Sequence, residues 1–208
     1  MAPWATASIW ASATSSKTMR RRMWPQLTAA VSVAAVLAPV QIVVATEYLS
    51  IDDAQRELFP AADRFVEVIP VLTPAQRQSV AALAGPQPAH RSLRVWRVLR
   101  GTELLGHVFV DEVIGRQDFI TYATGIDAAG HSLKLEVLAY RESHGGEIRN
   151  AAWRRQFEGR QGLGQLRFRT DIQNIAGATL SSEHVTQGVR WITALWQVIL
   201  RPDAATSP

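Results

Sequence analysis

The chain contains no cysteine in its 208 residues. It therefore has no disulfide, no lipid-modified cysteine, no cysteine-ligated iron–sulfur cluster and no c-type haem attachment site. Any redox chemistry would need a different cofactor. The histidines show no paired metal-ligand spacing, and we expect surface or loop positions for all of them rather than a metal site. They are His90, His107, His131, His144 and His184.

The common catalytic motifs are also missing from the sequence. It has no Gly-x-Ser-x-Gly nucleophile elbow, no His-Glu-x-x-His zinc motif and no dinucleotide-binding fingerprint. We therefore identify no catalytic residue and no metal ligand, and we find no internal repeat.

Acidic residues are absent from residues 1–45, whose basic residues are Lys17 and the three arginines at 20–22. The formal net charge of +4 lies entirely in this leader, so the rest of the chain is near neutral and we expect no nucleic-acid partner. The arginines precede an apolar segment, 27–45, that ends in small residues before Thr46. This order is typical of a cleaved signal peptide, and the segment is also about long enough for an N-terminal membrane anchor.

The true start of the chain is open, because Met19 and Met23 would serve equally well for translation. The arginines lack the flanking residues of a twin-arginine signal, so general secretion is the expected route. We therefore expect an extracytoplasmic (periplasmic) protein, either soluble after cleavage or tethered to the inner membrane.

Two short helices are predicted in an N-terminal helical segment, 46–90. The first begins after Ser50 and stops at Pro60. The second follows a capping box at 73–76 with a proline at the first helical position, and Gly85 ends it.

The remaining segment, 91–208, predicts a sheet followed by helices. Apolar alternation between turn signals predicts strands at 93–99, 104–114, 119–126 and 133–140. Hairpin turns are expected at 101–102 and 127–130, and helices at about 147–158 and 182–200. This order predicts an α+β fold: a single domain in which an antiparallel sheet packs against helices on one side.

The last predicted helix carries one apolar stripe, which core packing explains without any cofactor. The stripe consists of Val185, Val189, Ile192, Trp196 and Ile199. Trp153 and Phe157, four residues apart, are expected to be core residues as well.

A Gly-Ala-Thr turn leads into this helix. Gly177 and Ala178 carry almost no side chain, so a ligand can approach the backbone closely, and Thr179 adds a hydroxyl. A helix that begins near Ser181 or Ser182 directs free N–H groups and a partial positive charge at the turn. The turn is therefore a candidate phosphate-binding site. The alternative is that Thr179 and the two serines only cap the helix.

These residues, with the Val-Thr-x-Gly-Val helix entry at 185–189, resemble the FMN-binding domain family. The family includes the G subunit of Rnf electron-transport complexes and the C subunit of the sodium-pumping NADH:quinone reductase. In it, the threonine of Gly-Ala-Thr carries FMN through a phosphoester bond. The resemblance implies that Thr179 is the attachment residue. The other residues that it places around the FMN phosphate are Gly177, Ala178, Leu180, Ser181 and Ser182.

Two positions depart from the family pattern. Ala176 stands where the family usually has Ser or Thr, and Gln173 stands where it has an acidic residue. A non-covalent or flavin-less sensory or scaffold domain of the same fold is therefore one alternative, and a flavin-dependent reductase is another.

The second candidate site is the strand end and loop at 140–147. The family carries Glu-Thr-x-Gly here; Glu142 and Gly145 match it, and Ser143 replaces the threonine. The resemblance implies that these residues contact the flavin ring, whereas the alternative is an ordinary turn between strand and helix.

The resemblance implies an electron-transfer flavoprotein rather than a stand-alone enzyme. A flavin transferase that uses FAD would be the partner for FMN attachment. Membrane or periplasmic redox proteins would be the electron partners.

Overall fold

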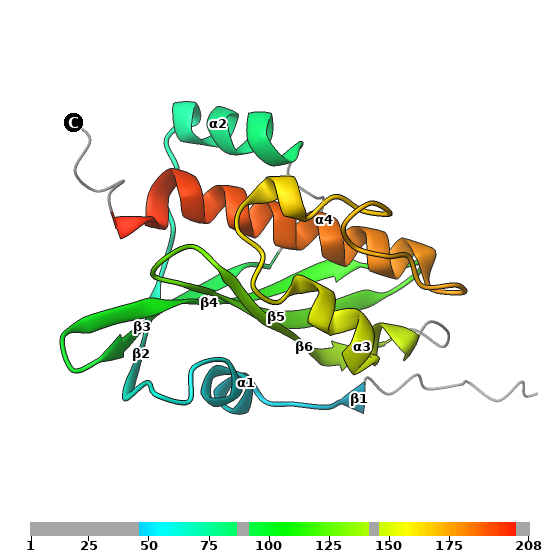
Figure 1. Ribbon diagram of the computed structural model, residues 1–208, viewed down its shortest axis with the longest axis horizontal. Helices are drawn as coiled ribbons and strands as arrows, with labels where there is room; N and C mark the ends of the chain where they lie inside the picture. The colour runs from blue at the N-terminus through cyan, green and yellow to red at the C-terminus, as the bar shows by residue number, and fades with distance from the viewer. Residues whose placement is uncertain (1–45, 87–91, 142–145, 203–208) are drawn as a thin grey trace, which may run out of the picture. The chain divides into compact units, whose positions relative to one another are not determined.

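A six-stranded antiparallel sheet with the order β1-β6-β5-β4-β3-β2 is the centre of the fold (Figure 1). The computed structural model describes residues 46–86, 92–141 and 146–202, all within one compact unit, Gln41–Pro208. The strands are β1 (Thr46–Glu47), β2 (Arg64–Val68), β3 (Arg94–Arg100), β4 (Glu103–Ile114), β5 (Phe119–Asp127) and β6 (Ser132–Tyr140).

The α-helices are α1 (Ile51–Leu58), α2 (Pro74–Ala84), α3 (Ala151–Arg154) and α4 (Thr179–Leu195). Three short 3-10 turns are η1 (Gly146–Arg149), η2 (Arg155–Phe157) and η3 (Leu163–Gln165). A π-helical turn, η4 (Trp196–Leu200), follows α4 directly.

Helices cover both faces of the sheet, with α2 and α4 on one face and α1 on the other (Figure 1). The larger apolar cluster packs sheet residues such as Phe109 against Val189 of α4. The smaller cluster packs Ala54 and Leu58 of α1 against Val108 and its neighbours on the opposite face. The predicted α+β class is confirmed. The expectation that helices lie on one side only was wrong, because α1 has an apolar face of its own to bury.

The predicted strands agree with β3, β4, β5 and β6 to within one residue at each end. Turns join β3 to β4 and β5 to β6 at the two places predicted. The two edge strands, β1 and β2, were missed. β1 has only two residues, and β2 lies mostly exposed at the sheet edge, so neither carries a clear apolar alternation.

The helix starts in the N-terminal segment are confirmed. The Ser50 hydroxyl accepts a hydrogen bond from the Asp53 N–H, which caps α1. At α2, the Thr73 hydroxyl accepts from the Gln76 N–H at 3.2 Å, and the Gln76 side chain accepts from the Thr73 N–H at 2.9 Å. This is the predicted capping box.

The helices after the sheet differ from their predicted bounds. The helix expected at 147–158 is divided into η1, α3 and η2, although Trp153 and Phe157 are buried and meet edge to face at 5.1 Å as core residues. The last helix begins at Thr179, three residues before the predicted start. Its apolar stripe, which continues into η4, joins the larger cluster as predicted: four of the five residues are buried there, and Ile199 packs against the cluster partly buried.

None of the described helices is long and apolar enough to cross a membrane. The predicted leader, 1–45, lies outside the described residues.

Candidate functional site: the turn before α4

The turn at Gly177 is open to an approaching ligand. The Gly177 φ of +85° lies in the left-handed region, where residues with a side chain are strained. Apart from the two chain neighbours of Gly177, no described residue has a heavy atom within 4 Å of the position that a Cβ would take there. The Ala178 N–H donates to the Ile175 carbonyl at 3.1 Å and closes the turn. The backbone is therefore shaped for close contact from outside.

Helix α4 begins immediately after this turn. Ala178 occupies the cap position, and no side chain caps the helix there. The first helical hydrogen bond runs from the Ser182 N–H to the Ala178 carbonyl at 2.9 Å. The N–H groups of the first turn thus face out of the helix and carry its partial positive charge, which suits a phosphate.

The two serines are not caps, so the predicted helix start near Ser181 or Ser182 was wrong. Both side chains are buried within the first turn of α4. The Ser182 hydroxyl, which has one hydrogen to donate, lies within 3.1 Å of oxygens on Asn174, Ala178 and Thr179. Ser182 therefore holds the turn from the inside. This also weakens the alternative in which Thr179 and the serines serve only as caps.

Two side chains of the α3–η2 segment fix the chain that leads into the turn. The indole N–H of Trp153 donates to the Gln173 carbonyl at 2.7 Å. The Gln173 N–H donates to the side-chain oxygen of Gln156, also at 2.7 Å. Sequence reasoning treated Trp153 only as a core residue and missed Gln156, because no spacing signal links residues so far apart in the chain.

Two further contacts tie the start and middle of α4 to the rest of the fold. The His184 imidazole is hydrogen-bonded to the Ile114 carbonyl at the end of β4. The Gln187 side chain donates to the Ala84 carbonyl at the end of α2. The turn is therefore positioned by the sheet and by α2, as well as by its own hydrogen bonds.

The structure does not test the second candidate site. Glu142, Ser143 and Gly145 lie outside the described residues, so their contact with the flavin ring stays a prediction.

One histidine departs from its predicted place. His107 is only 3% exposed on β4, although we expected a surface or loop position. Burial, with a smaller contribution from the neighbouring charge of Arg97, lowers the pKa of His107 to about 4. Its Nδ1 atom has no hydrogen-bond partner among the described residues. Within the same part of the chain, no group of three His, Asp or Glu side chains could hold a metal ion.

Comparison with known families agrees with this geometry. Residues 115–192 match the family model of the FMN-binding domain, and the match includes both the Gly-Ala-Thr turn and Trp153. These residues therefore form an FMN-binding domain, and the match supports FMN as its cofactor. No curated protein matches the chain.

The residues at the turn fit the phosphate end of FMN. Gly177 leaves space at the backbone, and the uncapped first turn of α4 supplies N–H donors. The Thr179 side chain is half-buried, and its hydroxyl makes no hydrogen bond to any described residue. The turn can thus hold a phosphate group and place a hydroxyl beside it.

Proposed function

We propose that the chain is an exported electron-transfer flavoprotein that carries FMN covalently on Thr179. One observation carries the proposal. Thr179 is the first residue of α4, directly after the open Gly177 turn and inside the segment that matches the FMN-binding family. Its hydroxyl is the only one in this turn, and a phosphoester needs such a hydroxyl.

The attachment reaction would use a flavin transferase with FAD as donor. The Thr179 oxygen forms a bond to the phosphorus of the FMN half, and the bond from that phosphorus to the oxygen of the AMP half breaks. AMP leaves and the hydroxyl proton is released. The first-turn N–H groups of α4 face the place where negative charge grows, which favours the transfer.

FMN supplies the redox chemistry by taking up electrons one or two at a time. The protein's part is to hold the cofactor at a defined place where a partner can reach it. Gly177 is exposed, and the next large apolar side chain, Leu180, is 44% exposed. This accessibility favours electron exchange with partner proteins, for which we propose membrane or periplasmic redox proteins.

Export is proposed from the leader, with a mature N-terminus at or near Thr46. Mass analysis of the protein from the extracytoplasmic fraction tests this. Full-length chain found only in membranes would indicate a retained anchor, and chain found only in the cytosol would contradict export.

The test of the attachment site is Thr179→Val, produced with a flavin transferase in an exporting host. Valine keeps the volume and removes the hydroxyl, so the variant should fold by circular dichroism yet lose flavin fluorescence that survives denaturing electrophoresis. The wild type should gain the mass of one FMN less a water. Thr170→Val, at an exposed threonine of the preceding loop, is the matched control and should keep the flavin.

Two results would change the proposal. Covalent FMN on Thr179→Val would move the attachment site elsewhere. A folded wild type that binds FMN but releases it on denaturation would support the non-covalent alternative instead.

A further inference from the structure

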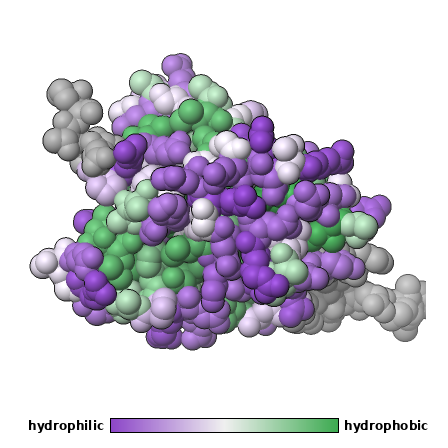
Figure 2. Space-filling model, viewed as in Figure 1, coloured by the Kyte–Doolittle hydropathy of each residue, from purple (hydrophilic) through white to green (hydrophobic). Residues whose placement is uncertain are grey.

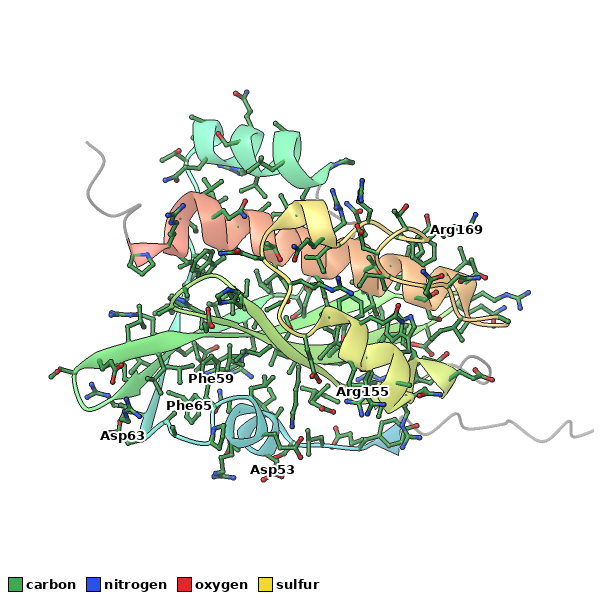
Figure 3. All side chains as sticks on the ribbon, viewed as in Figure 1. Asp53, Phe59, Asp63, Phe65, Arg155 and Arg169 are labelled. Atoms are coloured by element: carbon green, nitrogen blue, oxygen red, sulfur yellow. The ribbon has the colours of Figure 1, made fainter. Side chains whose placement is uncertain are left out.

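Charge is unevenly distributed over the described residues. The segment 149–169 runs from the end of η1 to the loop before the turn at 177–179, which we name the flavin turn after the function proposed above. This segment is rich in arginine and has Glu158 as its one acid. Its arginines are Arg149, Arg154, Arg155, Arg160, Arg167 and Arg169. On the side of the sheet that α1 covers, where Figure 3 labels Asp53 and Asp63, acids and bases are mixed: Arg56 of α1 pairs with Asp53 at 3.1 Å.

Several of these arginines have partners within the fold. Arg154 pairs with Glu136, and Arg167 pairs with Asp171 at 2.9 Å. The Arg167 guanidinium, through its hydrogen bond, lowers the pKa of Asp171 to about 2, so this pair stays charged. Arg155 and Arg169 are exposed, and no described carboxylate pairs with either of them. These two side chains leave positive charge directed at solvent.

Arg169 holds its exposed position in a strained conformation. Its φ is +65°, and it is the only residue other than glycine with positive φ in the described part of the chain. Glycine or asparagine suits that conformation better than arginine does. The guanidinium lies 5.6 Å from the centre of the Phe168 ring, within the range of a cation–π contact. A strained residue at a loop tip motivates a functional explanation.

The segments that carry the two arginines are both connected to the chain that leads into the Gly177 turn. The loop that carries Arg169 continues into Gln173, whose backbone is held by Trp153 and Gln156 on either side of Arg155. Figure 3 shows Arg169 in the loop above the beginning of α4 and Arg155 lower in the view, at α3. Figure 2 shows that hydrophilic side chains cover this face over α3 and the following loop.

We propose that Arg155 and Arg169 form a docking surface for an acidic redox protein, with the exposed Leu180 as an apolar contact beside the flavin turn. This proposal specifies the class of partner for the electron transfer proposed above, and it rests on that function. Steering by opposite charges accelerates encounter of two proteins, and an apolar centre with a charged rim is a common interface design.

The side chains favour a protein partner over an anionic membrane. The segment contains arginine and no lysine, and the planar guanidinium binds carboxylates through two parallel hydrogen bonds. Binding to a membrane surface strengthens with the apolar area that enters the lipid. On the proposed surface, Leu180 is the one exposed large apolar side chain among the described residues, and the arginine segment itself adds none.

The test measures binding of fluorescently labelled poly-L-glutamate by anisotropy, with and without flavin on the protein. Wild type should bind at low salt and lose affinity as salt rises, since the screening length is about 10 Å at 0.1 M. Arg155→Glu combined with Arg169→Glu should weaken binding about tenfold. Arg56→Glu combined with Arg64→Glu makes the same charge change on α1 and β2 and should have little effect.

Other outcomes would overturn the proposal. Equal weakening by the two double variants would mean that only overall charge matters. Binding to phosphatidylglycerol vesicles without binding to poly-L-glutamate would assign the surface to a membrane. Binding of poly-L-glutamate needs no flavin. The docking proposal can therefore be tested even if FMN never attaches to the protein.

A second variant separates docking from folding. Arg169→Gly removes one charge and relieves the positive φ, so its Tm should equal or exceed that of wild type while poly-L-glutamate binding weakens. A lower Tm together with unchanged binding would show that Arg169 serves the fold instead.

The FMN-loaded protein tests whether the surface lies beside the flavin. After reduction with dithionite, oxidation by the anion ferricyanide should slow in the Arg155 and Arg169 double variant, and oxidation by the cation hexaammineruthenium(III) should not. Equal rates in wild type and variant would place the charged surface away from the flavin and overturn the proposal.

Discussion

The Tyr122 hydroxyl donates a hydrogen bond of 2.7 Å to the Asp111 carboxylate, and both side chains are completely buried beneath α4. Gly188 of α4 lies over the pair. A Cβ at Gly188 would stand 2.2 Å from the Tyr122 oxygen and 3.1 Å from a carboxylate oxygen of Asp111. Helix α4 can approach the sheet this closely because residue 188 has no side chain. The Gly177 turn is continuous with α4, so this contact helps to set the position of the turn.

We predict that Gly188→Ala destabilises the protein by about 1–3 kcal/mol, because the methyl group collides with a buried hydroxyl. Helix propensity alone would favour alanine by about 1 kcal/mol, so the sign of the change in the free energy of unfolding distinguishes the two effects. Urea unfolding followed by circular dichroism measures the change. Gly164→Ala, where nothing lies within 4 Å of the added atom, is the matched control and should be nearly neutral. A more stable Gly188→Ala protein would contradict the packing.

The hydroxyl itself can be tested with Tyr122→Phe. Loss of this donor to the buried Asp111 should cost about 1–3 kcal/mol. Because the atom nearest to a new Cβ at residue 188 is the Tyr122 oxygen, Tyr122→Phe and Gly188→Ala should together cost less than the sum of the single changes. Additive losses in free energy of unfolding would show that the Tyr122 hydroxyl is not the obstacle.

Ser182→Ala should destabilise the Gly177 turn although Ser182 is not the helix cap. The change removes a buried hydroxyl that lies within hydrogen-bond distance of Asn174, Ala178 and Thr179, at a cost of about 1 kcal/mol. Hydrogen exchange should accelerate at the amides of residues 175–179 and much less in the sheet. Ser79→Ala, which removes an exposed hydroxyl from α2, is the control and should leave those amides unchanged.

Much of the fold could be predicted from local sequence signals. The capping box at Thr73 and the hairpin turn at Gly101 each depend on a few adjacent residues, and both appear where expected. The Gly177 turn was also recognisable, since the residues that form it are neighbours in the chain. The edge strand β2 could not be recognised in this way. It pairs with β3 across a connection that contains α2, and its own short sequence carries no pattern that indicates this pairing.

The errors at the site concern residues whose environment is set by distant parts of the chain. Ser182 looks like a cap in the sequence, and only the bend at Asn174 shows that its hydroxyl points inward. His107 stands in an alternating strand and would suit a surface position, but the face that it shares with Phe109 is covered in the fold. Such burial depends on the packing of helices onto the sheet, which periodicity within β4 does not specify.

His107 predicts a loss of stability on mild acidification. The folded protein keeps the ring neutral down to a pKa of about 4, whereas the unfolded chain takes up the proton near 6.5. The unfolded state therefore binds the proton preferentially between these two values. The contribution of His107 to the free energy of unfolding is fully present above the unfolded pKa and is lost as the pH falls toward the folded pKa. The loss attributable to His107 should approach about 3 kcal/mol at the acidic end.

His107→Leu should remove this part of the pH dependence, since leucine does not titrate. Urea unfolding at pH 7 and pH 4.5 measures the difference between variant and wild type. His131→Gln, at a hairpin position whose side chain is 42% exposed, is the control and should retain the wild-type slope. A wild-type slope in His107→Leu would show that other groups cause the acid sensitivity.

The departures from the family pattern at Gln173 and Ala176 predict a gain of function. Both side chains are exposed, and hydrogen bonds to Trp153 and Gln156 hold the Gln173 backbone whatever its side chain. Gln173→Glu with Ala176→Ser should therefore change stability by less than about 0.5 kcal/mol. If a flavin transferase recognises these positions, the double variant should carry covalent FMN on a larger fraction of molecules, measured by intact mass.

The control Gln165→Glu adds the same charge at an exposed position of η3 and should leave the fraction of FMN-loaded molecules unchanged. Equal FMN loading in wild type and double variant would show that the Gly-Ala-Thr turn and α4 are sufficient for recognition.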